Sequence, residues 1–274
     1  MARLPQFYGG TGVPLVVDAD PKGPAVAWRS QRARTRAWLD SLVDTEWDGP
    51  TRCESWDTSE LVRHMTSASQ FLGYTLRQAI EDDPTTLLQG MDTRTTVADA
   101  AAMLGELEPG TARVLLASTD AAVDSALTAL DDAGWSAIAE APPGHMPADL
   151  VLSHFLFDSW VHEYDLLVPR GEQPVVEDLE SEVVLRYLVG LASVTSGSVT
   201  ALELRATEPE LLIGVTAGEG ATTVTVGAAH PGAAVIEGRV ADIVDRTSGR
   251  EAGPVGGDPA GLSVLDEFSL LLAT

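Results

Sequence analysis

The stretch PADLVLSHFLFDSWVHEYDLLV, residues 147–168, decides how the rest of this chain is interpreted. Its length and apolar content predict a buried helix. His154, Asp158 and His162 recur along it at intervals of four. Residues four apart lie on one face of a helix, so Asp158 and His162 can bind the same metal ion. The residues leave one alternative open, which is a hydrogen bond between Asp158 and His162 within the helix.

A second helical segment offers a third ligand. SELVRHM, residues 59–65, carries His64 about two turns after Asp57, whose D-x-x-E spacing to Glu60 is typical of a helix start. Three protein ligands leave one position open on a tetrahedral ion, as catalytic zinc requires. His154 is rotated by about 80° from His162 around the helix. It is therefore either a residue behind the ligands that orients them or an interior residue.

The hydrophobic period divides the chain. From about residue 24 to 195, hydrophobic residues recur with the period of a helix. From 199 to 237 the period is close to two residues, so we expect strands there, followed by two short helices. Residues 131–146, which contain paired prolines, are expected to be a loop, and His145 within them and His230 further on are expected to be exposed. The predicted domains are an N-terminal extension, a helical domain and a smaller α+β domain, with the bounds 1–23, 24–175 and 176–274.

Composition restricts the partners. The net charge is −24 and the sequence pI is about 4.3, so the surface repels phosphate backbones and anionic lipids, and we expect no nucleic acid and no membrane as partner. No apolar run in the sequence approaches the roughly 18 residues of a membrane span. The N-terminus lacks the apolar core and small-residue cleavage site of a signal peptide. Cys53 is the only cysteine, which excludes an intrachain disulfide and fits a cytoplasmic location.

The sequence lacks the residues that several classes of enzyme require. Lys22 is the only lysine, and its surroundings do not match a phosphate-binding loop; a Schiff-base enzyme is likewise not expected. The chain contains no G-x-S-x-G, the usual mark of an α/β-hydrolase nucleophile. The glycines of FYGGTG, residues 7–12, follow no predicted strand and are interpreted as a loop. Nucleotide binding therefore has no support in the sequence.

The segment W-x-x-P-T-R-C-E-S-W-D-T-S-E-L-V-R-H, residues 47–64, resembles the N-terminal signature of the mycothiol-dependent maleylpyruvate isomerase family. This family is part of the DinB-like superfamily of metal-binding four-helix bundles. Asp158-Ser-Trp-Val-His162 is similar to the family's second metal motif. The resemblance implies that His64, Asp158 and His162 are the metal ligands. The isomerase has glutamate where this chain has Asp158, which implies a different coordination geometry or metal preference.

The C-terminal region also resembles the family, with VIEGRVADIVDRTSGR at residues 235–250 similar to its sterol carrier protein-like α+β module. The resemblance spans about residues 24–255. The C-terminal motif of this chain lacks the tryptophan that the family usually has before the terminal Gly-Arg. Arginine pairs well with carboxylates, so Arg239 and Arg250 are the expected anchors for the cofactor or substrate, with Arg250 at the Gly-Arg position.

The resemblance implies a metal-dependent enzyme that uses a low-molecular-weight thiol, mycothiol, against a small electrophile. Zinc is the expected metal, and the reaction is either an isomerisation or an S-transfer. An alternative of another class is a non-catalytic protein that binds a metal or a thiol conjugate in the same pocket. A third is a degenerate member in which Asp158 and His162 merely pair. We expect a monomer or a homodimer.

Overall fold

The computed structural model describes residues 4–92 and 95–272 of the chain. The chain folds into two compact units, one formed by residues 24–175 and the other by residues 1–23 together with 176–274. The first 23 residues, expected as a separate extension, thus group with the C-terminal part. The reason is strand β1, Leu15–Asp18, which pairs in parallel with β6, Thr222–Val226.

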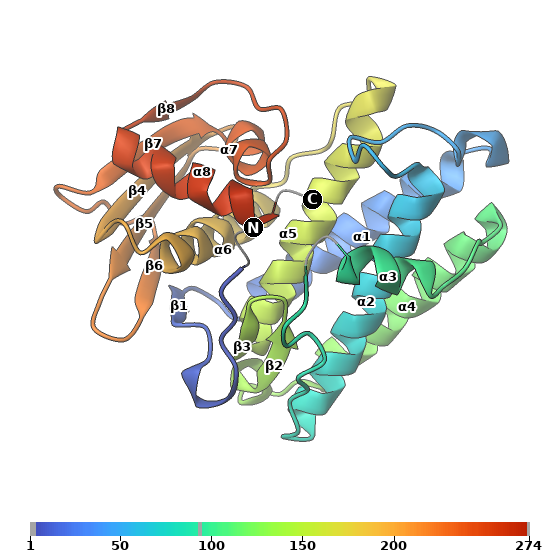
Figure 1. Ribbon diagram of the computed structural model, residues 1–274, viewed down its shortest axis with the longest axis horizontal. Coiled ribbons are helices and arrows are strands. Elements are labelled where there is room, and N and C mark those ends of the chain that lie inside the picture. Colours follow the sequence, from blue (N-terminus) through green and yellow to red (C-terminus); the bar gives the residue numbers. More distant parts are fainter. Residues whose placement is uncertain (1–3, 93–94, 273–274) are drawn as a thin grey trace. The chain divides into compact units, whose positions relative to one another are not determined.

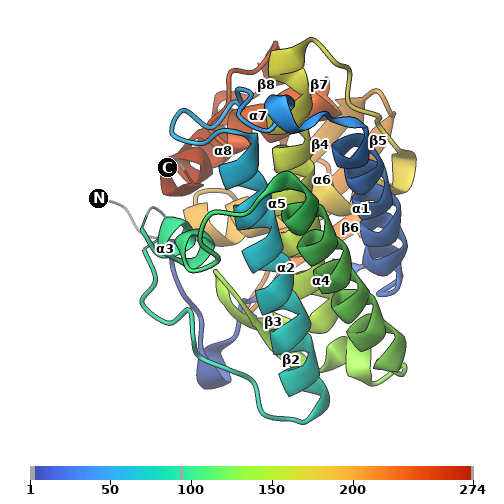
Figure 2. The ribbon, with the colours of Figure 1, turned by 90° about the vertical axis from the view of Figure 1, so that its right-hand side faces the viewer.

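The unit of residues 24–175 is mainly helical (Figures 1 and 2). α2 packs against α3, α4 and α5, while a cluster that includes Leu39, Trp47 and Leu116 joins α1 to α2 and α4. Its helices are α1 (Gly23–Ser41), α2 (Thr58–Ile80), α3 (Thr96–Ala102), α4 (Pro109–Ala129) and α5 (Ala148–Leu167).

Buried ion pairs also hold α1 in place. Arg32 and Arg36 on α1 both pair with Asp120 on α4, and Arg34 pairs with Glu163 on α5. A buried carboxylate is costly unless it is paired and hydrogen-bonded, and these arginines meet that requirement. The acidic residues of the interior therefore fix which faces of the helices meet.

One expectation for this unit is wrong. Residues 131–146, expected as a loop, contain a β-hairpin made by β2, Ile138–Ala141, and β3, Gly144–Pro147. His145 is 6% exposed, and its Nε2 lies 2.7 Å from the carbonyl oxygen of Thr85. His145 is thus buried and hydrogen-bonded, not an exposed imidazole. The paired prolines and glycines suggested a loop, but tertiary contacts with α2 and α5 order the hairpin.

The other unit contains a mixed sheet with the order β1-β6-β5-β4-β7-β8. α6, α7 and α8 contact one another as well as the strands (Figure 1), and they bury side chains such as Leu204, Ile213 and Val224. The remaining elements are α6 (Asp178–Ser196), β4 (Ala201–Thr207), β5 (Leu211–Ala217), β7 (Ala234–Arg239), α7 (Val240–Thr247), β8 (Val255–Gly257) and α8 (Pro259–Leu272). The described helices are all too short or too polar to span a bilayer.

Gly190 allows a close approach inside this unit. A Cβ atom at this position of α6 would lie 2.7 Å from a methyl carbon of Leu15 and 2.8 Å from one of Val224. Both distances are shorter than a van der Waals contact, so a side chain here would force β1 and β6 away from α6. The N-terminal strand therefore fits against a helix that begins more than 150 residues later.

Candidate metal centre

The position of His64 along helix α2 is well defined because hydrogen bonds fix the N-terminus of that helix. The carboxylate of Asp57 accepts a hydrogen bond from the backbone N–H of Glu60 (2.8 Å), and the carboxylate of Glu60 accepts one from the N–H of Asp57 (3.0 Å). This is a complete capping box, as the D-x-x-E spacing predicted. His64 follows two turns later and is 6% exposed.

Helix α5 presents Asp158 and His162 to the same side. Almost every other residue of this helix is buried, including the polar residues Ser159, Glu163 and Asp165. The side chain of Asp158 is one of two exceptions, with 29% of its surface exposed, whereas the side chain of His162 is 10% exposed. The carboxylate therefore lies where the interior meets solvent, in reach of a small molecule.

The three side chains expected as ligands are close together. The Nε2 atom of His64 lies 3.5 Å from Oδ2 of Asp158, and Nε2 of His162 lies 3.5 Å from its Oδ1. The two imidazole rings meet edge to face with 4.7 Å between their centroids. One ligand atom from each residue lies within 4.8 Å of the other two. The helix spacing and the resemblance thus led to residues that the fold brings together.

These separations suit a small divalent ion. Two ligand atoms about 2.0–2.1 Å from a tetrahedral zinc ion are about 3.4 Å apart, and each histidine Nε2 lies 3.5 Å from one of the two carboxylate oxygens of Asp158. Two imidazole nitrogens and one carboxylate oxygen form a donor set that zinc and other first-row transition metals accept. The residues present therefore fit such a group.

The three residues also influence one another's protonation. Burial on its own raises the pKa of Asp158, but the charges and hydrogen bonds of His162 and His64 outweigh it and hold this pKa well below its usual range. Burial on its own lowers the pKa of His162. Asp158, together with hydrogen bonds from Asp158, Asp165 and Cys53, outweighs this effect and raises the pKa well above its usual range.

His154 lies apart from the three side chains that converge. It is 8% exposed, and its ring packs edge to face on Phe155 with 5.4 Å between centroids. Burial lowers its pKa to about 4, although the charge of Asp158 acts in the opposite direction. His154 is therefore a neutral interior imidazole at neutral pH, and a role in orienting the ligands stays a prediction.

Asp165 was not expected in the site, yet it contacts His162 directly. Its Oδ2 lies 3.0 Å from Nδ1 of His162, and its Oδ1 accepts a hydrogen bond from Nε of Arg52 (2.8 Å). The thiol of Cys53 donates to the same Oδ2 at 3.3 Å. The signal in the sequence was the spacing of three residues from His162, which places Asp165 one turn along the same helix face.

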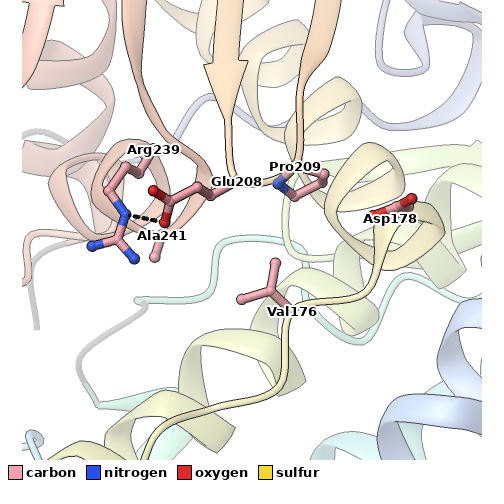
Figure 3. A pocket seen from close by; sticks show the side chains of 6 residues that line it. All are labelled: Val176, Asp178, Glu208, Pro209, Arg239 and Ala241. Atoms are coloured by element: carbon pink, nitrogen blue, oxygen red, sulfur yellow. Dashed lines mark ion pairs between the residues drawn. The ribbon is translucent and has the colours of Figure 1, made fainter.

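Arg239 and Arg250, the expected carboxylate anchors, lie in the other unit. Arg239 forms an ion pair with Glu208 (2.8 Å) at the edge of a pocket of about 320 Å³ (Figure 3). The lining residues are Val176, Asp178, Glu208, Pro209, Arg239 and Ala241. Arg250 lies at the other end of α7, where its guanidinium donates to the carbonyl oxygen of Ser248 (3.2 Å). The two arginines therefore do not share this pocket, and their roles stay predictions.

Residues 28–167, just over half of the chain, match the family model described as the mycothiol maleylpyruvate isomerase N-terminal domain. The chain belongs to this family. The matched residues include His64, Asp158 and His162, so the converging side chains lie inside the domain that defines the family. No curated protein sequence matches the chain.

Two solved structures of this family share the fold. One is the crystal structure of the mycothiol-dependent maleylpyruvate isomerase, with 21% sequence identity and a TM-score of 0.60. The other is a mutant of that isomerase in which alanine replaces a histidine, with 22% identity and a TM-score of 0.61. Each match covers 88% of this chain and 93% of the isomerase chain. The likeness therefore extends over both units.

Proposed function

We propose that this protein is a metal- and thiol-dependent enzyme in which His64, Asp158 and His162 hold one divalent ion, with zinc favoured. The observation that supports this most directly is the convergence of the three ligand atoms within 4.8 Å. Membership in a family named after a mycothiol-dependent isomerase supports mycothiol as the thiol. The helical unit then corresponds to a DinB-like four-helix bundle and the other unit to a sterol carrier protein-like module.

The bound ion supplies a Lewis acid that lowers the pKa of a thiol and so provides a thiolate at neutral pH. The residues of the chain set the conditions for this chemistry. The exposed edge of Asp158 gives a small thiol access, while the buried rings of His64 and His162 limit the water around it. Trp56 covers His64, with 5.2 Å between ring centroids, and adds an apolar wall.

The substrate class follows from what a thiolate does. In an isomerisation, sulfur adds to one carbon of a conjugated double bond and the π electrons move to the conjugated carbonyl group. The remaining single bond rotates, and the carbon–sulfur bond then breaks to restore the double bond and release the thiol. In an S-transfer, the carbon–sulfur bond persists and the electrophile takes a proton or loses its leaving group. Maleylpyruvate, the substrate in the name of the family, is the first compound to test.

Metal content tests the ligands. Protein purified without chelator is expected to contain about one zinc per chain by elemental analysis, and His64→Ala and Asp158→Ala are expected to lose most of it. His230→Ala removes a partly exposed imidazole from the other unit and is the matched control. A metal-free wild type, or His64→Ala protein with full metal content, would contradict the proposed ligand set.

Turnover tests the reaction. With mycothiol present, the zinc-loaded protein is expected to convert maleylpyruvate or another conjugated small electrophile, and omission of the thiol is expected to stop the reaction. Activity that survives His64→Ala would count against the mechanism. Tight binding of zinc and thiol without turnover of any electrophile would instead support the non-catalytic binding protein.

A further inference from the structure

Behind His162, on the side away from Asp158, lies a second polar cluster formed by Arg52, Cys53 and Asp165. Asp165 is completely buried, and 15% of the Arg52 side chain is exposed. The backbone also links the two elements, since the N–H of Arg52 donates to the carbonyl oxygen of Asp165 (3.1 Å). The loop before α2 is thus attached to α5 at the level of His162.

His162 belongs to two groups whose ligand atoms are close enough to bind a metal ion. One contains His64 and Asp158, and the other contains Cys53 and Asp165. In the second group, the guanidinium of Arg52 bonds to Oδ1 of Asp165, so an ion there would lie next to a fixed positive charge. Both oxygens of Asp165 are also already engaged as hydrogen-bond acceptors. The Nε2 side of His162 is therefore the metal side.

We propose that Asp165 is a positioning residue that fixes His162 in the tautomer a metal needs, and that Arg52 in turn fixes Asp165. This inference rests on the proposed metal site. Neutral imidazole carries one proton, and a ring that donates from Nδ1 leaves the lone pair on Nε2. With Nδ1 donating to Asp165, Nε2 of His162 faces Asp158, 3.5 Å away, and this is the nitrogen that gives up its proton when a metal ion binds. The ring cannot flip without breaking the bond to a buried carboxylate.

His64, the other proposed histidine ligand, differs from His162 in the surroundings of its Nδ1 atom. Its Nδ1 atom is buried and has no hydrogen-bond partner among the described residues. Its ring is held by packing against Trp56 and by the edge-to-face contact with His162. Of the two histidines, only His162 is thus held at Nδ1 by a hydrogen bond among the described residues.

Asp165→Asn is the decisive substitution because an amide has one acceptor and one donor. Arg52 can only donate, so the amide oxygen of the new side chain stays with Arg52 and its NH₂ group faces Nδ1 of His162. His162 must then accept at Nδ1 and carry its proton on Nε2, where the metal would bind. We expect zinc affinity, measured by competition with a chelator, to fall about 10–100-fold.

Two further variants separate this effect from a loss of stability. Asp120→Asn weakens another buried arginine–aspartate cluster of the same unit and is expected to leave zinc affinity within about twofold of the wild type. Arg52→Met combined with Asp165→Asn frees the amide to turn its oxygen toward Nδ1 of His162. This double variant also removes the guanidinium charge that Asp165→Asn deprives of its carboxylate, and it is expected to regain much of the lost affinity.

Each outcome decides between the possibilities. Wild-type affinity in Asp165→Asn overturns the inference, as does an equal loss in Asp120→Asn, which would indicate general destabilisation. A double variant that binds zinc no better than Asp165→Asn overturns the tautomer argument. Failure of the wild type to bind zinc is a separate result, which overturns the proposed function and this inference with it.

Discussion

At the scale of single residues, different neighbours give three equally buried helix histidines different properties. His162 is held by two carboxylates, His64 has its acidic neighbour at 3.5 Å, and His154 lies against Phe155 with a lowered pKa. The same side chain is thus a candidate ligand in two positions and a packed neutral ring in the third. The interval of four in the sequence could not distinguish these environments.

His154 predicts a measurable dependence of stability on pH. Burial lowers its pKa from the ordinary value of 6.5 to about 4, so between these values the unfolded chain binds a proton that the folded chain does not. The stability is therefore fully present above pH 6.5 and is lost as pH falls toward 4. The loss between pH 7 and pH 5 is about 2 kcal/mol.

His154→Gln is expected to abolish that part of the loss. Free energies of unfolding from urea titrations at pH 7 and pH 5, with chelator in both, give the comparison between variant and wild type. The other titrating groups are common to both proteins and cancel in the difference. The same pH dependence in both proteins would contradict a neutral, buried His154.

At the scale of elements, α2 and α5 determine the site because each fixes one side of it. The capping box was readable from sequence because all its atoms lie within four residues. The hairpin of β2 and β3 was not, because Glu140 in β2 is stabilised by distant partners. Its carboxylate accepts hydrogen bonds from the N–H groups of Leu87 and Leu88 (2.8 and 2.6 Å). Contacts across more than 50 residues have no local signature.

Asp57→Ala is expected to lower the free energy of unfolding of the helical unit by about 1 kcal/mol, since it leaves the N–H of Glu60 without its cap. Denaturant unfolding followed by circular dichroism measures the effect. Ser59→Ala in the same turn leaves both bonds of the box intact and is the control. Equal stability of the Asp57 variant and this control would show that the box contributes nothing.

At the scale of the whole molecule, β1 joins the start of the chain to its last hundred residues. Leu15 is 4% exposed and packs where Gly190 leaves room on α6, whereas the adjacent Val16 is 51% exposed. Alternation of buried and exposed residues is the mark of a strand with one covered face. The segment that contains β1 is thus part of a folded unit.

Leu15→Ala is expected to destabilise that unit by about 3 kcal/mol, because it removes buried methyl groups and leaves a cavity beside α6. Hydrogen exchange of the amides in β5 and β6 should become markedly faster, while α2 and α5 should keep their protection. Val16→Ala changes the exposed neighbour and should alter the exchange little. An equal effect of the two substitutions would contradict the packing of β1.

The sequence by itself determined the helical and sheet-rich regions, the start of α2 and the family, because these depend on local period, local capping and short motifs. It also indicated Asp158 and His162 by their spacing of four on one helix, and His64 by the motif that resembles the family signature. Only the tertiary structure decided that Arg52 and Asp165 lie beside His162, that His145 is buried and that β1 joins the distant sheet. Each of these depends on a contact between residues more than 50 positions apart: Arg52 with Asp165, Thr85 with His145, and β1 with β6. Contacts at that range are set by the packing of the folded chain and leave no local pattern in the sequence.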